Sequence, residues 1–226
     1  MKICVIIPAF NNETTVAAVV KKARQEVDHV VVIDDGSTDG TAQASKDAGA
    51  HVIEITKNRG KGNALRVGFR YALAHDFDAS ITLDADLQHD PSEIPKFVDC
   101  YATTRANIII GNRLGGKEEI PRIRYGLNRI GVYTFSWLLG QSVEDSQCGY
   151  RLYDREVMEG IPIINEGFEA EADILLRAGK RGFTIGFVPI KTIYFSNRSH
   201  RSYYRPVKDT FRICMIFLMN LFWKDR

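Results

Sequence analysis

The residues with the clearest chemical potential are the carboxylates and the amide of Asp84-Ala85-Asp86-Leu87-Gln88. Asp84 and Asp86 are two positions apart, so on an extended chain both side chains point to the same side. Their carboxylates and the amide oxygen of Gln88 are hard oxygen ligands, which suit Mg²⁺ or Mn²⁺. The simpler interpretation is a polar turn before a helix that starts at Asp90-Pro91, and the triplet alone does not decide between the two.

The elements around this acidic stretch explain how it would be positioned. The run 79–83 reads as a strand, which places the carboxylates at a strand's carboxyl end, where open α/β sheets bind ligands. Apolar runs rich in β-branched residues predict strands at 3–7, 29–33, 51–55, 79–83 and 107–110. The helices expected in this half cover 13–26, 41–48, the segment after 58–63, and 92–101. This alternation predicts an α/β fold with a single, mainly parallel, Rossmann-like sheet flanked by helices.

Two further polar stretches follow predicted strands. Residues 34–41 read as a turn and then a helix start, because Ser, Thr and Asp are good N-caps. Residues 58–63 form a basic, glycine-bearing loop that contains Lys61 and opens a helix. Such a loop at a helix N-terminus can hold phosphate, although the Walker spacing is absent. A capped surface loop explains the same residues equally well.

The size and composition of the chain exclude several protein classes. The chain has 226 residues, 45% hydrophobic and 26% charged, which suits one α/β domain with room for an appendage. A net charge of +2 provides no global field for nucleic acid, so no nucleic-acid partner is expected. The four cysteines form no C-x-x-C pair and indicate a reducing, cytoplasmic compartment. No apolar stretch reaches the roughly 18 residues that span a membrane, and the opening run is too short for a signal peptide.

The second half of the chain is basic and ends in an apolar segment. A helix is expected at 168–178 and a strand at 183–195, which Pro189 interrupts. Basic residues are frequent between 113 and 129 and again between 198 and 212, and 213–223 is apolar. A basic run before an apolar helix that carries a Trp predicts an amphipathic anchor at a membrane surface. The alternative is a helix that packs on the domain or on a second subunit of a homodimer. The predicted division is 1–212 for the main domain and 213–226 for this helix.

Five motifs, in this order along the chain, carry a resemblance to a known family. They lie at 7–13, 34–41, 84–88, 111–113 and 145–151. Together they resemble the family 2 glycosyltransferases of the GT-A fold, most closely the dolichyl- or polyprenyl-phosphate sugar synthases, over about residues 2 to 212. The resemblance implies a metal-dependent, inverting transfer of mannose or glucose from a GDP- or UDP-linked donor to a polyprenyl phosphate. It also implies a cytoplasmic protein, peripheral at the inner face of the membrane.

The resemblance also implies roles for individual residues. The pocket for the nucleotide sugar would be formed by Pro8, Ala9, Glu13, Ile33, Asp35, Lys61, Asp84 and Ala85. The metal would be held by Asp84, Asp86 and Gln88, and Arg113 and Arg151 would meet sugar or phosphate groups. The predicted catalytic set is Asp86, Arg113, Asp145 and Arg151, in which Asp145 is chosen for its chemistry rather than from the resemblance. The chain departs from the family pattern at Ala9-Phe10, at 148–150 and in the tail at 199–205, and the last difference concerns the acceptor.

The acceptor decides which groups the reaction needs. A lipid phosphate has a second pKa of about 6 and is already an oxyanion at neutral pH, so it needs arginines rather than a base. A saccharide hydroxyl needs a general base, for which Asp145, with Glu144 beside it, is the candidate. The arginines between 113 and 151 favour the phosphate. A third interpretation is a nucleotide-binding module without catalysis. A nucleotidyltransferase is disfavoured, because its glycine-rich first loop is missing at 8–10.

Overall fold

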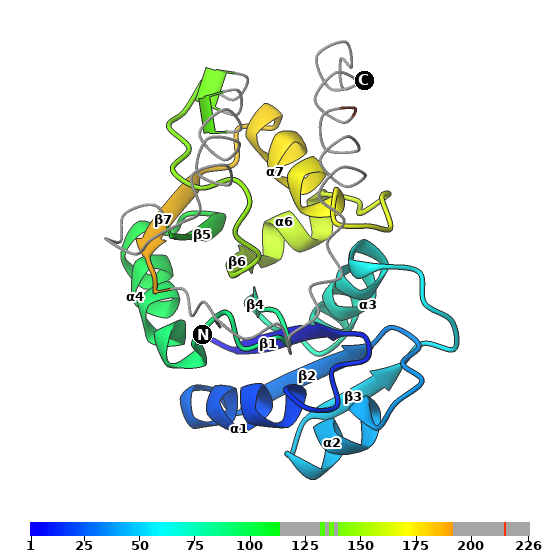
Figure 1. Ribbon diagram of the computed structural model, residues 1–226. Coiled ribbons are helices and arrows are strands. Elements are labelled where there is room, and N and C mark those ends of the chain that lie inside the picture. Colours follow the sequence, from blue (N-terminus) through cyan, green and yellow to red (C-terminus); the bar gives the residue numbers. More distant parts are fainter. Residues whose placement is uncertain (114–131, 134–135, 138–139, 192–214, 216–226) are drawn as a thin grey trace.

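The computed structural model describes residues 1–113, 132, 133, 136, 137, 140–191 and 215 (Figure 1). Within these residues the chain forms one seven-stranded sheet with the strand order β3-β2-β1-β4-β6-β5-β7. The strands are β1 Ile3–Ala9, β2 His29–Asp34, β3 His51–Glu54, β4 Ala79–Thr82, β5 Ile108–Asn112, β6 Arg151–Asp154 and β7 Ile185–Pro189. Only β6 is antiparallel to its neighbours, so the predicted mainly parallel sheet is confirmed.

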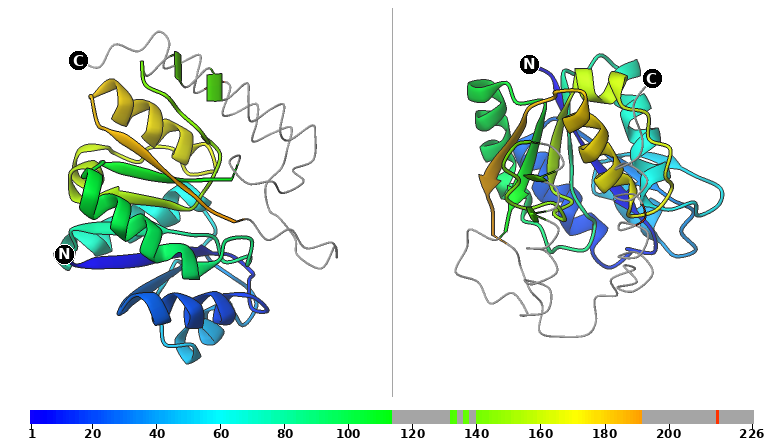
Figure 2. Two further views of the ribbon diagram at one scale, coloured as in Figure 1. Left: turned by 90° about the vertical axis from the view of Figure 1, so that its left-hand side faces the viewer. Right: turned by 90° about the horizontal axis from the view of Figure 1, so that it is seen from above.

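Helices cover both faces of this sheet (Figure 2). One face carries α1 Val16–Glu26, α2 Thr41–Asp47 and α4 Ile94–Thr104, which follows the short 3₁₀ helix η1 Pro91–Glu93. The other carries α3 Lys61–Ala74, α6 Arg155–Gly160 and α7 Ala170–Lys180, with α3 in contact with both of the others. Because both faces are covered, the central strands are buried on both sides and read as continuous apolar runs.

Several boundaries differ from the sequence prediction. The helix expected at 13–26 begins only at Val16, because the N–H groups of Thr15 and Val16 donate to Asn12 O and form a turn first. The strand expected at 183–195 is shorter, and its last residue is Pro189, which has no N–H for a strand ladder.

Two elements, β6 and α6, were not predicted. The strand β6 has only four residues, Arg-Leu-Tyr-Asp, without an apolar run that predicts a strand, and α6 begins directly at its end. The Asp154 side chain caps α6 by accepting a hydrogen bond from Val157 N–H at 2.9 Å. Since β6 runs antiparallel, its first residue, Arg151, lies beside Thr82 and Ile110, at the carboxyl ends of β4 and β5. The loop 145–150 is thereby brought to the edge of the sheet where ligands are expected.

Some predicted features lie outside the described residues. These are the basic residues between 117 and 129, the basic tail 198–212, the boundary at 212 and, except for Met215, the C-terminal helix 213–226. In the part of the chain that the structure describes, no helix combines the length and the apolar character needed to cross a bilayer.

Candidate active site

One edge of the sheet collects most of the residues that the sequence singled out. The parallel strands β1, β2 and β4 end there, and Asp35 N–H donates to Ala9 O at 2.9 Å. The antiparallel β6 starts at the same edge, where Thr82 Oγ1 donates to Gly149 O at 3.1 Å. The acidic turn 84–88 and the loop 145–150 therefore lie next to each other, although about sixty residues separate them in the chain.

The acidic turn keeps its carboxylates partly open to solvent. The Asp84 side chain is 32% exposed, and Asp86 accepts a hydrogen bond from Gln88 N–H at 3.0 Å. Leu87 has φ 65°, a left-handed conformation that a leucine rarely adopts, and such strain is typical of functional turns. Burial and the neighbouring Asp84 charge raise the pKa of Asp86 to about 6. Two carboxylates in this arrangement are stabilised by an added cation.

Lys61, at the start of α3, contributes a cation to this turn. Its Nζ lies 2.6 Å from Asp84 Oδ1 and 3.1 Å from Glu171 Oε2, and only 9% of the side chain is exposed. Burial by itself would lower the pKa of Lys61, but the two carboxylates raise it above its ordinary value. Burial alone would raise the pKa of Asp84, yet Lys61 holds it below its ordinary value. Both groups are therefore charged near neutral pH.

Three residues of this site were not identified from the sequence. Glu171 lies on α7 and pairs with Lys61, and His89 Nδ1 lies 4.0 Å from Asp84 Oδ2. Burial lowers the pKa of His89 to about 4, so the ring is neutral. A Cβ on Gly149 would lie 2.7 Å from Lys61 Nζ and 3.0 Å from Asp84 Oδ2, so a larger residue there would displace the ammonium group from its present position. The glycine stands within the motif 145–151, whereas Glu171 had no local signal beyond an acidic helix start.

Arg113 and Asp145 form a bidentate ion pair at the end of β5. Arg113 Nε and Nη2 lie 2.8 Å and 3.0 Å from the two carboxylate oxygens, and Asp145 is fully buried. Asp145 also accepts hydrogen bonds from the N–H groups of Gln147 and Cys148. Burial alone would raise the pKa of Asp145, but Arg113 and these donors hold it below its ordinary value. A carboxylate so stabilised is a weak base.

Arg151, expected to meet sugar or phosphate groups, is buried beneath this edge of the sheet. Its side chain is 1% exposed, and the guanidinium donates to the carbonyl oxygens of Cys148, Glu171 and Ser146 at 2.7–2.8 Å. The geometry therefore supports a different role, in which Arg151 holds the loop 145–150 against the start of α7.

The loop 58–63 is held by the protein rather than left open for phosphate. Both carboxylate oxygens of Asp35 accept from Arg59 N–H at 3.1 Å, and Gly60 N–H donates to Oδ2 at 2.6 Å. The N–H groups of Gly62 and Asn63 donate to Glu166 O. These contacts favour the interpretation as a capped loop. They also show that Asp35, which is 3% exposed, orders this loop directly.

The remaining predicted donor-site residues lie at the same edge with different exposure. Glu13 is exposed, and its Oε2 accepts from Gly40 N–H at 3.2 Å. Pro8 is half-buried, whereas Ala9, Ile33 and Ala85 are buried. The three buried residues therefore pack beneath the site. Gln88 is half-buried in the acidic turn.

The donor set at the acidic turn fits a divalent cation that also binds a ligand. Within the described ranges, no three His, Cys, Asp or Glu side chains form a ready metal cage. Mg²⁺ and Mn²⁺ sites commonly use one or two carboxylates and complete their coordination with water and substrate phosphates. Asp84 and Asp86, partly exposed and close enough to couple electrostatically, match that type of site.

Comparison with known proteins agrees with this arrangement. An undecaprenyl-phosphate mannosyltransferase of Micrococcus luteus is 30% identical over 203 residues, 84% of this chain and 83% of that protein. A dolichyl-phosphate hexose transferase of Haloferax volcanii is 33% identical over 196 residues, 83% of this chain and 81% of that protein. The fold matches glucosyl-3-phosphoglycerate synthase from Mycobacterium tuberculosis, solved with Mn²⁺, UDP and phosphoglyceric acid, with a TM-score of 0.77 and 22% identity over 99% of this chain and 80% of that one. The family described as glycosyl transferase family 2 matches residues 4–161. The chain is therefore a glycosyltransferase of the GT-A fold and belongs to glycosyl transferase family 2.

Proposed function

We propose that this enzyme transfers a hexose, mannose or glucose, from a GDP- or UDP-linked donor to a polyprenyl phosphate, with inversion at the anomeric carbon. The observation that carries the proposal is the meeting, at one sheet edge, of the partly exposed carboxylates Asp84 and Asp86 with the cations Lys61 and Arg113. Such a site can hold a diphosphate and a second anion close together.

The donor half of the site is formed by the ends of β1, β2 and β4. Glu13 and Asp35 lie at this edge, and Asp84, Asp86 and Gln88 would hold Mg²⁺ or Mn²⁺. A bound divalent ion would supply Lewis-acid stabilisation for the charge of the departing nucleotide diphosphate. Lys61 remains a fixed positive charge beside Asp84, where it would add to the binding of the diphosphate.

The state of Asp145 favours a phosphate acceptor over a hydroxyl. Deprotonating a hydroxyl requires a base that readily accepts a proton. Asp145 is buried, bound by Arg113 on both oxygens and has a lowered pKa, so it does not suit that role. A polyprenyl phosphate supplies its own oxyanion, and Arg113 would orient it. The names of the bacterial and archaeal relatives, which act on undecaprenyl and dolichyl phosphates, support the same acceptor class.

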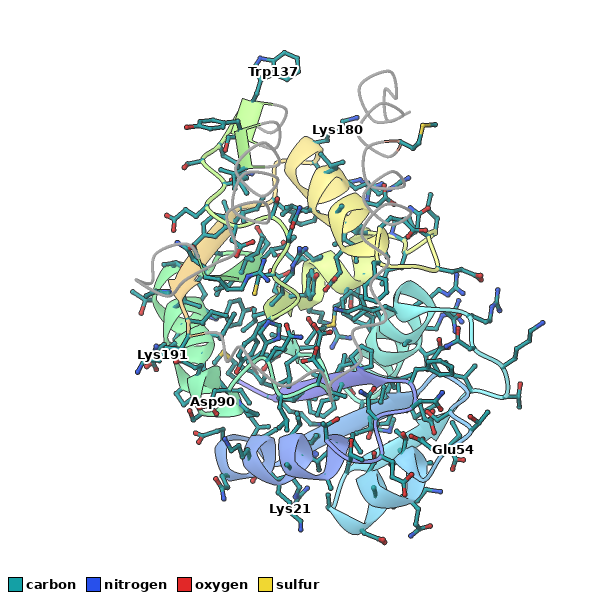
Figure 3. All side chains as sticks on the ribbon, viewed as in Figure 1. Lys21, Glu54, Asp90, Trp137, Lys180 and Lys191 are labelled. Carbon is teal, nitrogen blue, oxygen red and sulfur yellow. The ribbon has the colours of Figure 1, made fainter. Side chains whose placement is uncertain are left out.

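A lipid acceptor places the enzyme at a membrane surface. Two aromatic side chains are exposed on the same part of the molecule: Trp137, at 74%, projects outward in Figure 3, and Tyr133 is 62% exposed. Aromatic rings with a polar atom favour the interface between headgroups and acyl chains. We infer peripheral binding at the cytoplasmic face, with the apolar segment 213–226, which the sequence predicts to be a helix, as a second contact.

The test is a transfer assay with a panel of nucleotide sugars in the presence of Mn²⁺ or Mg²⁺. Three acceptors are compared: a short polyprenyl phosphate, the dephosphorylated polyprenol and soluble oligosaccharides. Transfer to the phosphate alone is expected. If polyprenol or an oligosaccharide serves equally well, the phosphate-acceptor proposal fails, and Asp145 becomes the first residue to test as a base. Metal-dependent hydrolysis of a nucleotide sugar, lost in Asp86→Ala, would exclude a binding module without catalysis.

A further inference from the structure

The Asp84 carboxylate, which we propose as a metal ligand, already has a cation beside it. Lys61 Nζ lies 2.6 Å from Asp84 Oδ1, on the buried side of the turn. The side chains of Lys61 and Glu171 are 9% and 10% exposed, whereas that of Asp84 is 32% exposed. Asp84 thus stands between a buried ammonium group and the open side of the site, and any metal must share this carboxylate with Lys61.

Glu171 is placed to take part in that sharing. Its Oε2 lies 3.1 Å from Lys61 Nζ. Its Oε1 is buried and accepts no hydrogen bond from the described residues. A Cβ on Gly149 would lie 3.3 Å from this oxygen, so the absence of a side chain there leaves the ammonium group and both carboxylates in direct proximity. A buried carboxylate with an unused oxygen can hold Lys61 more tightly than it does in this state.

The spacing between Lys61 and Glu171 is fixed by the backbone. Gly62 N–H donates to Glu166 O at 2.7 Å, which joins the start of α3 to the turn before α7. A Cβ on Gly60 would lie 2.5 Å from Glu166 O, and one on Gly62 would lie 2.2 Å from Asn165 O, so the two segments touch through glycines. Arg151 Nη1 donates to the Glu171 carbonyl oxygen at 2.8 Å and fixes the first turn of α7.

We propose that Lys61 is a resident cation that competes with the divalent metal for Asp84, and that Glu171 is a positioning residue that controls this competition. Glu171 gives Lys61 a second anion, so Asp84 can accept the metal while Lys61 stays neutralised. Without that second anion, the ammonium group depends on Asp84 alone and resists the metal by repulsion at short range. The inference rests on the proposed use of a divalent metal, and it concerns affinity for the metal rather than the identity of the donor or acceptor.

The experiment measures Mn²⁺ binding to the full chain without nucleotide, from the EPR signal of free Mn²⁺. Glu171→Gln is expected to weaken Mn²⁺ binding by roughly tenfold, because a nearby carboxylate charge is lost at low effective dielectric. Lys61→Met is expected to tighten it, because the competing cation is gone. The matched control is Glu166→Gln, the same chemical change at an exposed carboxylate that pairs with Arg59, and its affinity should equal that of the wild type.

Transfer activity separates a metal effect from a general structural defect. Raising the Mn²⁺ concentration should restore transfer by Glu171→Gln, which loss of structure would not allow. If Lys61→Met does not fold, the double variant Lys61→Met with Glu171→Gln removes both charges together and should bind Mn²⁺ more tightly than Glu171→Gln alone.

Two results would overturn the inference. Equal Mn²⁺ affinities in all variants, with transfer to polyprenyl phosphate intact, would remove it and leave the proposed function standing. Absence of Mn²⁺ binding in the wild type and in every variant, together with full transfer in excess EDTA, would remove it along with the metal requirement of the proposed function.

Discussion

The carboxylates at the edge of the sheet that carries the site form two groups. The motifs 34–41, 84–88 and 145–151 contain all of them and do not separate one group from the other. Asp35 and Asp145 are buried, and several backbone N–H groups or an arginine bind their oxygens. Asp84 and Asp86 are partly exposed; one faces a lysine on its buried side, and the other is bound within its own turn. The first group holds loops in place, and the second has capacity left for a ligand.

The environment of each carboxylate, rather than its residue type, therefore separates structural carboxylates from those that can bind a ligand. A buried carboxylate must be satisfied by protein donors, because an unpaired buried charge is costly. A partly exposed carboxylate can be satisfied by water and can exchange that water for a metal or a ligand. Substitutions in the first group should therefore change stability, and those in the second should change activity.

The largest effect is expected for Arg151→Met, which removes the cation that holds the loop 145–150, where the buried carboxylate Asp145 lies. Three carbonyl oxygens would lose their donor, and each unsatisfied buried group costs about 1–3 kcal/mol, so the free energy of unfolding should fall by at least about 3 kcal/mol. Urea denaturation measures this change. Arg155→Met, which removes a partly exposed pair with Glu159, is the control and should cost less than about 1 kcal/mol. A small effect at Arg151 would mean that its guanidinium faces the ligand instead.

Asp145→Asn should lower the free energy of unfolding by about 3 kcal/mol, because Arg113 would lose its buried partner. The folded-state pKa of Asp145 lies below its ordinary value of 3.8, so the charged group stabilises the fold above about pH 4. This contribution is lost as the pH falls through the lowered pKa, and wild type and variant should then converge. Urea denaturation of both proteins, in steps of about one pH unit from about pH 3 to about pH 7, measures this change in the stability difference. The exposed neighbour Glu144→Gln is the control, and a difference independent of pH would contradict the ion pair.

Asp86→Asn tests the partly exposed carboxylates and should reduce the rate of transfer by about 10²-fold. Loss of one group that stabilises charge in the transition state typically has an effect of this size. The melting temperature should stay close to that of the wild type, because Asp86 is bound mainly within its own turn. Steady-state transfer and thermal denaturation are measured on the same protein. Full turnover by the wild type in excess EDTA would remove the metal from the mechanism.

The smallest effect is expected for Glu13→Gln. Its Oε2 accepts a hydrogen bond from Gly40 N–H, and replacing a charged acceptor by a neutral one should weaken nucleotide binding by roughly two- to fivefold. Isothermal titration with GDP and UDP measures the change. Glu54→Gln, at an exposed residue that is labelled in Figure 3 and pairs with Lys46, is the control. Equal nucleotide affinity in Glu13→Gln and wild type would place the nucleotide away from the 36–41 turn.

Six of the seven described strands and the place of the acidic turn could be predicted from the sequence. Continuous apolar runs at 3–7, 29–33 and 79–83 predict buried parallel strands, because only side chains that suit both faces can occupy them. Polar residues directly after such strands must collect at one edge, which made the region of Asp84 and Asp86 predictable. The family resemblance was confirmed for the same reason, since its motifs are the strand ends themselves.

Which of these residues remain open to a ligand depends on how the chain packs. The four residues of β6 form no apolar run, and their antiparallel pairing with β4 and β5 brings Gly149 and Asp145 to the acidic turn. Lys61 and Glu171 are 110 positions apart in sequence, and backbone contacts between α3 and the turn before α7 bring them together. Local spacing cannot encode such pairings, because they depend on which distant donors and charges meet a carboxylate once the chain is packed.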